Sequence, residues 1–232
     1  MAIIELKNLQ KNYGSEPAVQ GINLSLEQGK IIGLLGPNGS GKTTIIKLIN
    51  GLIPPTSGEI LVDGKAVGVE SKKIISYLPE RTYLDPNMSV RECIRFFKDF
   101  YEDFNPDKAA ELIQKLGIPP KKKLKTLSKG TKEKIQLILV MSRKAKVYIL
   151  DEPIAGVDPA SRDYILDTIL NNFDTGATLI ICTHLISDIE RILDEVVFLS
   201  HGRILVNDSA DNIRNKYQSS IDAAFREVFR CS

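Results

Sequence analysis

Cysteine is scarce in this chain, and its three cysteines, Cys93, Cys182 and Cys231, lie far apart in the sequence. An odd number without any Cys-x-x-Cys pair argues against a disulfide framework and gives no sign of a zinc site. Cys182 lies in an apolar run and is expected to be a small core residue. This use of cysteine favours a reducing, cytosolic setting.

Net charge is also nearly absent, because 31 Lys and Arg residues face 29 Asp and Glu residues, a formal balance of +2. Bulk charge therefore points neither to nucleic acid nor to a membrane surface. One basic run, at residues 118–125, has no interleaved aromatic residues and is expected to be a solvated loop. We expect no nucleic-acid partner.

Long apolar segments are missing too. No apolar run approaches the roughly 18 residues that a membrane-spanning helix needs. Residues 1–6 lack the basic start and the cleavage site of a signal peptide. The 232 residues are enough for one large domain, or for a domain that carries a small lobe.

A glycine-rich segment is the strongest pattern that is present. Residues 36–44 match the phosphate-loop motif, which is Gly, four residues, Gly, Lys, then Ser or Thr. A predicted buried strand at 30–35 precedes the segment, and a predicted helix at 43–50 follows it. Glycines let backbone N–H groups close on phosphate oxygens, and the helix N-terminus adds its dipole. The predicted nucleotide-binding residues are Gly36, Pro37, Asn38, Gly39, Ser40, Gly41, Lys42, Thr43 and Thr44.

Two side chains of this segment have specific expected roles. The Lys42 ammonium can reach the β- and γ-phosphates, and the Thr43 hydroxyl can bind Mg²⁺. The alternative interpretation is a glycine-rich strand-to-helix turn that binds no ligand.

A second motif places two acids at the end of an apolar run. Residues 147–150 read Val-Tyr-Ile-Leu, and Asp151 and Glu152 follow. Ligands of open α/β sheets bind at the carboxyl ends of the strands. Asp151 is therefore expected to bind Mg²⁺, and Glu152 to polarise a water against the γ-phosphate. A solvated strand end is the alternative, and the motif gains its weight from the phosphate loop before it.

The alternation of predicted strands and helices favours an α/β fold with a mainly parallel sheet, and the phosphate-loop motif within it favours the P-loop NTPase class. An antiparallel β edge layer is expected from strands at 3–9 and 18–27, with a bulge near Gly21, and from a hairpin at 59–64. A turn is expected at 11–14. The other predicted strands are 73–78, 177–182, 195–199 and 203–206, and the other predicted helices are 127–144, 160–173, 185–193 and 211–229.

Aromatic residues gather in a segment at 89–117 that has a helical pattern divided at Asn105-Pro106. Phe96, Phe97, Phe100, Tyr101 and Phe104 recur there at helical spacing. This stripe is either the core of a small lobe or a groove for a helix of a partner.

With these motifs in order, the chain resembles the nucleotide-binding subunit of ATP-binding cassette (ABC) transporters from about residue 3 to about residue 207. The resemblance implies a dimer that sandwiches two ATP molecules. It also implies one ABC ATPase domain over 1–232: an α/β core at 1–80 and 146–207, a helical signature lobe at 81–145 and a C-terminal helix at 208–232.

The resemblance assigns further residues. Tyr13 matches the aromatic residue that stacks on adenine, although a simple turn tyrosine remains the alternative. Asp158 matches the loop that contacts the opposite subunit, and His184 matches the histidine that contacts the γ-phosphate. The segment Ser128, Lys129, Gly130 and Thr131 matches the signature that binds ATP across the dimer.

Two departures from the family pattern stand out. Glu80 replaces the usual glutamine, and its carboxylate is still a possible Mg²⁺ ligand that adds negative charge near the phosphates. Lys129 and Thr131 replace the second glycine and the glutamine of the usual signature. Neither change removes the catalytic set, so an active ATPase with Mg²⁺ is expected, and the Lys-containing signature resembles the exporter subset.

The resemblance further implies a partner permease with its own membrane spans, a homodimer or heterodimer of ATPase subunits, and a cytoplasmic position at the inner face of the membrane. One alternative is a soluble, non-transport ABC ATPase that acts on ribosomes or DNA repair. Another is a different P-loop class, such as a GTPase, although Asn215-Lys216-Tyr217-Gln218 lacks the Asp of the guanine-reading motif. A third is a nucleotide binder without turnover, which intact Glu152 and His184 argue against.

Overall fold

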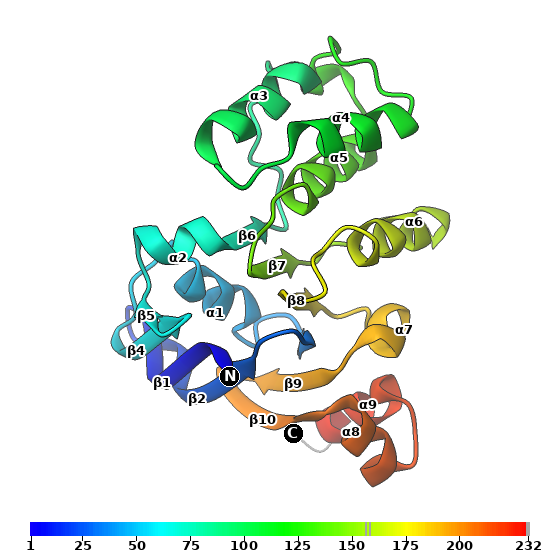
Figure 1. Cartoon of the computed structure of the whole chain (residues 1–232). Coiled ribbons are helices and arrows are strands. Elements are labelled where there is room, and N and C mark those ends of the chain that lie inside the picture. The colour runs from blue at the N-terminus through cyan, green and yellow to red at the C-terminus, as the bar shows by residue number, and fades with distance from the viewer. Residues whose placement is uncertain (156, 158, 231–232) are drawn as a thin grey trace.

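A six-stranded sheet runs through the centre of the molecule (Figure 1). The computed structural model describes residues 1–155, 157 and 159–230. The strand order is β10-β9-β3-β8-β7-β6, with β10 antiparallel to β9 and the other neighbours parallel. The strands are β3 (Ile31–Leu35), β6 (Ile75–Leu78), β7 (Val147–Asp151), β8 (Thr178–Thr183), β9 (Glu195–Ser200) and β10 (Arg203–Ser209). This is the mainly parallel core that the sequence predicts.

A second, antiparallel sheet lies beside the first with the order β2-β1-β4-β5. Its strands are β1 (Ala2–Tyr13), β2 (Glu16–Glu27), β4 (Ser57–Val62) and β5 (Lys65–Ala66). The predicted bulge occurs at Gly21, where the β1–β2 register shifts and the backbone has a φ of 66°. The predicted hairpin turn at Asp63 and Gly64 is also present, and both residues have positive φ. The antiparallel edge layer is therefore confirmed.

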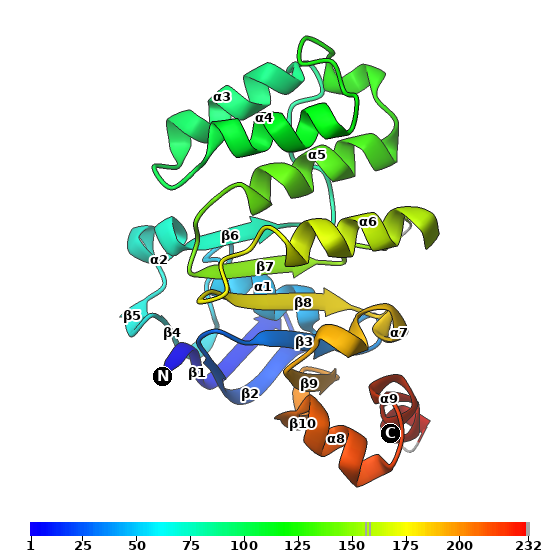
Figure 2. The ribbon, with the colours of Figure 1, turned by 45° about the vertical axis from the view of Figure 1, so that its right-hand side comes forward.

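Helices cover both faces of the central sheet (Figure 2). Helix α1 (Lys42–Ile49) fills the space between the two sheets, where its isoleucines and Leu48 join one apolar core. The opposite face packs against α6 (Pro159–Leu170), α7 (Ile186–Ile189), α8 (Ala210–Tyr217) and α9 (Ile221–Arg230). Successive side chains of β7 alternate between the two cores, with Ile149 on the α1 side and Leu150 on the other.

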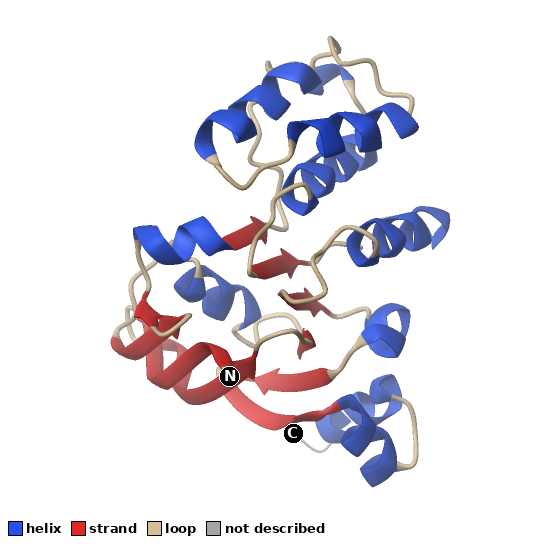
Figure 3. Ribbon diagram, viewed as in Figure 1, coloured by secondary structure: helices blue, strands red, loops and turns tan. Residues whose placement is uncertain are grey.

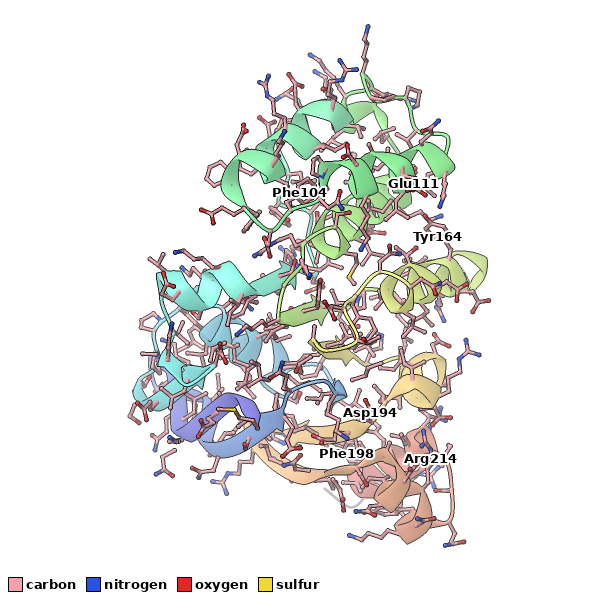
Figure 4. The ribbon with its side chains drawn as sticks, viewed as in Figure 1. Phe104, Glu111, Tyr164, Asp194, Phe198 and Arg214 are labelled. Atoms are coloured by element: carbon pink, nitrogen blue, oxygen red, sulfur yellow. The ribbon has the colours of Figure 1, made fainter. Side chains whose placement is uncertain are left out.

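A group of helices joined by loops forms a lobe beside the edge strand β6 (Figures 1 and 3). They are α3 (Val90–Phe100), α4 (Pro106–Lys115) and α5 (Lys129–Met141). Ser89 and Glu92 form a capping box that begins α3, and the Asn105 side chain accepts from Lys108 N to begin α4. Figure 4 shows Phe104 in this lobe, whereas Asp194, Phe198 and Arg214 lie at the other end of the molecule.

The predicted aromatic stripe divides into two parts. Phe97 and Phe104 are buried in the core of the lobe, with ring centroids 5.5 Å apart. Phe96 and Phe100 stack on each other at 4.5 Å, yet they are 42% and 69% exposed. The first pair belongs to the core interpretation, and the second pair remains available on the surface.

Three predictions of local structure were wrong. The expected strand at 73–78 is preceded by a short helix, α2 (Val69–Ile74), so β6 begins only at Ile75. The expected turn at 11–14 is strand as far as Tyr13, because β1 pairs with β2 along that length. The expected single helix at 211–229 is two helices, since Gln218 ends α8 in the left-handed conformation with a φ of 48°.

Candidate functional site

The loop between β3 and α1 has a shape that only glycine permits at two positions. A Cβ on Gly36 would lie 2.3 Å from the carbonyl oxygen of Leu199. A Cβ on Gly41 would lie 2.6 Å from the carbonyl oxygen of Ala18, and Gly41 also has a φ of 107°. The loop can therefore pack closely against β2, the end of β9 and the β9–β10 turn, and the residues that begin α1 line a cavity.

The Lys42 side chain lies within this loop. Its ammonium donates to the carbonyl oxygens of Gly36 at 2.7 Å and Pro37 at 3.0 Å, and the residue is 6% exposed. The β9–β10 turn supports the loop from behind, because Gly202 N donates to Ser40 O at 2.8 Å. A cavity of about 290 Å³ opens over the loop, lined by Ala18, Asn38, Gly39, Ser40, Gly41, Lys42, Thr43, Thr44, Glu80, Glu152, Ala155 and His184.

Asp151, the last residue of β7, is 1% exposed. Burial raises the pKa of this carboxyl, and the neighbouring Cys182 and Thr43 side chains offset part of the rise. A buried carboxylate disfavours its own charged form until a cation is bound beside it. This property fits Mg²⁺, which commonly takes one or two protein carboxylates and completes its shell with water and phosphate oxygens.

Glu80 contributes a second carboxylate to the same region. It is exposed, and it lines both the cavity over the loop and a neighbouring cavity of about 400 Å³ that Asp151, Glu152 and Lys129 also line. Within the described residues, no three His, Cys, Asp or Glu side chains group as a metal site by themselves. Glu80 and Asp151 are two carboxylates that border the same neighbouring cavity.

Glu152 and His184 meet where β7 and β8 end. Nδ1 of His184 lies 3.0 Å from Oε1 and 3.1 Å from Oε2 of Glu152. Thr183 Oγ1 donates to Oε2 at 3.0 Å. The Glu152 side chain is 12% exposed, whereas the His184 side chain is 47% exposed. A carboxylate held in this way at the wall of the cavity has the placement that a general base needs.

The signature residues lie apart from this group, at the N-terminus of α5. Ser128 caps the helix, because its Oγ accepts from Thr131 N at 3.2 Å and lies 2.8 Å from Thr131 Oγ1. Lys129 pairs with Glu133 at 3.8 Å and its side chain is 83% exposed. Ser128, Lys129, Gly130 and Thr131 are all absent from the lining of the cavity over the phosphate loop.

Tyr13 and Asp158 complete the predicted set. Tyr13 ends β1, is 49% exposed, and has the Lys11 ammonium 5.5 Å from the centre of its ring. Its ring is not part of the cavity lining. Asp158 lies outside the described residues.

Sequence reasoning missed three residues of the site: Ala18, Thr183 and Ala155, which lines the cavity over the loop. Ala18 backs the loop, and only the tertiary fold brings β2 to Gly41. Thr183 touches Glu152, and its sole sequence signal is its place beside His184 at a strand end.

Known proteins resemble this chain in sequence and in fold. The profile of a family described as "ABC transporter" matches residues 19–155. The linearmycin resistance ATP-binding protein LnrL of Bacillus subtilis is 34% identical over 88% of this chain and 68% of its own length. The lantibiotic transport ATP-binding protein SrtF of Streptococcus pyogenes is 27% identical over 94% of this chain and 97% of its own length. A solved ATP-binding subunit of an ABC transporter superposes with a TM-score of 0.88 at 26% identity, covering 98% of this chain and 99% of that one.

Proposed function

The chain belongs to the ABC transporter family and is an ATP-binding, ATP-hydrolysing subunit, and from this premise we propose that it drives an exporter. The observation that carries the catalytic part of the proposal is the carboxylate of Glu152, held by His184 and Thr183 at the wall of the cavity over the phosphate loop. The reaction is the hydrolysis of ATP to ADP and phosphate.

Binding begins with the phosphates. The backbone N–H groups of the loop and of the N-terminus of α1 donate hydrogen bonds to the phosphate oxygens. The Lys42 ammonium leaves the carbonyl oxygens of Gly36 and Pro37 and binds phosphate oxygens instead. Thr43, Asp151 and Glu80 are the residues that would hold Mg²⁺. The ion would supply positive charge that offsets the charge developing on the phosphate oxygens.

Hydrolysis then depends on the orientation of one water molecule. Glu152 accepts a proton from this water as the oxygen attacks the γ-phosphate. The His184 side chain is nearly half exposed and faces the cavity, so it can move from Glu152 to contact the γ-phosphate.

A second copy or a related subunit completes each site. Ser128, Lys129, Gly130 and Thr131 are absent from the cavity lining of their own chain, yet Ser128 begins a 13-residue helix whose N-terminus suits a phosphate. We assign these residues to the ATP held by the opposite subunit, with Tyr13 as the adenine platform and Asp158 as a contact between subunits. ATP then bridges two surfaces that ADP cannot, which favours the closed dimer.

The direction of transport comes from the relatives. One is a linearmycin resistance protein and another is a lantibiotic transport protein, and both functions fit removal of a compound from the cell. In the described part of this chain no helix is long and apolar enough to cross a membrane. We assign the membrane passage to a permease on another chain, which the lobe at 81–145 contacts from the cytoplasmic side.

A trapping experiment tests this proposal. Tagged Glu152→Gln protein is expressed in its native host, membranes are dissolved in mild detergent with Mg-ATP, and copurifying proteins are identified. We expect a protein with several membrane spans to copurify in a stoichiometric amount with the tagged chain. We expect this protein to be lost when wild-type chain is purified with ADP instead. Recovery with ribosomes, with DNA-repair proteins or with no partner would refute the transport role while leaving the ATPase assignment in place.

A further inference from the structure

We propose that Thr183 is a positioning residue that fixes the Glu152 carboxylate for ATP hydrolysis. The inference rests on the proposed role of Glu152 as the base. Thr183 ends β8, next to the β7 terminus that carries Asp151 and Glu152, because β7 and β8 pair in parallel as far as Asp151 and Cys182.

The Thr183 hydroxyl has two hydrogen-bond partners, one that donates to it and one that accepts from it. Leu185 N donates to Thr183 Oγ1 at 3.1 Å, which occupies the hydroxyl as an acceptor. The single hydroxyl proton then goes to Oε2 of Glu152, 3.0 Å away. Thr183 is 0% exposed, so its hydroxyl has no access to solvent.

The backbone of Glu152 depends on the same strand. Glu152 has a φ of 53°, the left-handed region that a non-glycine residue occupies only at a cost. Its N–H donates to the carbonyl oxygen of Cys182 at 2.7 Å. The end of β8 therefore holds Glu152 twice, by its main chain through Cys182 and by its carboxylate through Thr183.

Thr183 and His184 play different parts in this arrangement. The His184 side chain is 47% exposed and faces the cavity, so it can move toward a phosphate. The buried Thr183 cannot follow that movement. We infer that Thr183 keeps the carboxylate oriented when His184 turns to the γ-phosphate, so that one ring can serve both contacts in turn.

The test compares three variants of the chain. Thr183→Val keeps the shape and removes the donor, Thr183→Ser keeps the donor, and Thr178→Val is the matched control. Thr178 is also a fully buried threonine of β8, and it too accepts one backbone N–H, from Gly29, but it donates to a backbone carbonyl, that of Glu27. We expect kcat of Thr183→Val to fall by about 10- to 100-fold with KM for ATP within about threefold, because a misplaced catalytic group costs rate more than binding.

A second readout separates positioning from general damage. If hydrolysis fails while ATP still binds, Thr183→Val should accumulate a Mg-ATP dimer on size-exclusion chromatography, as Glu152→Gln should. Thr183→Ser and Thr178→Val should retain kcat within about threefold and show no trapped dimer. Thr183→Ala replaces the valine variant in both assays if that one does not fold.

The outcomes are distinct. The positioning role would be overturned if Thr183→Val and Thr183→Ser had the same kcat, or if Thr178→Val lost as much kcat as Thr183→Val. ATP hydrolysis by the wild-type protein would then still support the proposed function. Wild-type protein without ATP turnover, or turnover that survives in Glu152→Gln, would instead remove the role of Glu152 on which the inference depends.

Discussion

The ammonium group of Lys42 lies 2.7 Å from the carbonyl oxygen of Gly36, six residues before it in the same loop. A second bond, to Pro37 O at 3.0 Å, means that two carbonyls share one buried cation. The lysine and the backbone that surrounds it therefore fix each other's position. When a phosphate binds, the Lys42 ammonium must leave these carbonyl oxygens while the loop keeps its shape. The space around each glycine of the loop therefore affects ATP binding and hydrolysis.

Two glycines of the loop should respond differently to alanine. In Gly36→Ala the new Cβ would lie 2.3 Å from Leu199 O, so the loop must move, and we expect kcat/KM for ATP to fall by about 100-fold. In Gly39→Ala the Cβ meets no atom within 4 Å, and only the φ of 81° opposes it, at a cost of about 1–2 kcal/mol in stability. Steady-state ATPase assays and thermal unfolding of both variants check the contrast. An equal loss of kcat/KM in the two variants would show that the contact between the new Cβ of Gly36→Ala and Leu199 O is relieved by a small movement of the chain.

Removal of the Asp151 charge should stabilise the protein in the absence of metal. Burial raises the pKa of Asp151 in the folded state, so its charged form is better tolerated in the unfolded chain. This unfavourable contribution is absent below the unfolded pKa and develops as pH rises through the folded pKa. Asp151→Asn should therefore have a higher melting temperature than wild type at pH 7 with EDTA, and this advantage should shrink in acid.

Ligand should reverse that order. Mg-ATP should raise the melting temperature of wild type more than that of Asp151→Asn, because only the carboxylate offers the metal a charge. Asp163→Asn, an exposed site on α6, is the control and should change neither value. A variant that melts below wild type in EDTA would show that the buried carboxylate is already compensated.

Glu80 should set the requirement for Mg²⁺. A unit charge about 4 Å from a cation is worth ~1 kcal/mol per charge even in water-like surroundings. Glu80→Gln should therefore raise the Mg²⁺ concentration for half-maximal ATPase activity by about fivefold or more. The matched control is Glu133→Gln, which changes a carboxylate of the neighbouring cavity that pairs with Lys129. An unchanged Mg²⁺ requirement in Glu80→Gln would remove Glu80 from the metal site.

The sequence was informative where one local pattern determines the structure. Buried strands such as β7 are continuous apolar runs, and the loop before α1 has glycine where the backbone needs it. It was uninformative where the tertiary fold decides. Gln218 is an ordinary helix former, yet its left-handed conformation separates α8 from α9, so that Phe225 and Phe229 can pack on Phe198.

The same limit applies to the site. The acids and the histidine could be predicted because each stands at the end of an apolar run. The bond from Thr183 to Glu152 depends on the pairing of β7 with β8 and spans 31 residues, so no local pattern reports it.

Arg143 should be the main link between the helical lobe and the sheet. Its side chain is 3% exposed, bonds both oxygens of Asp103, and donates to the carbonyls of Lys73 and Ile75, while its guanidinium stacks 3.9 Å from the centre of the Tyr101 ring. Arg143→Met would leave these acceptors unpaired and should cost about 3–5 kcal/mol in the free energy of unfolding by urea.

Two further variants interpret that loss. Arg143→Lys keeps the charge without the planar fork and should fall between wild type and Arg143→Met. Arg91→Met, at an exposed position of α3, should stay within about 0.5 kcal/mol of wild type. A stable Arg143→Met protein would show that the apolar contacts of the lobe are sufficient to hold it.

The two halves of the aromatic stripe should give opposite phenotypes. Phe97 is 2% exposed among the apolar side chains of the lobe, so Phe97→Ala should lose about 3–5 kcal/mol of stability through the cavity that it leaves. Phe100→Ala, at a position 69% exposed, should stay within about 0.5 kcal/mol of wild type. Urea unfolding of the two purified variants measures both values.

The exposed pair, Phe96 and Phe100, is the part of the stripe that can contact a permease. Changing both to alanine should leave the ATPase activity of the soluble chain intact and reduce transport in cells, since the rings touch only each other and Phe97 among the ring contacts of the described chain. Leu52→Ala, which removes a 55% exposed leucine just after α1, is the control for loss of surface apolar area. Transport that survives the double change would exclude this pair as the coupling surface, and a matching loss in Leu52→Ala would show that the effect is not specific to the lobe.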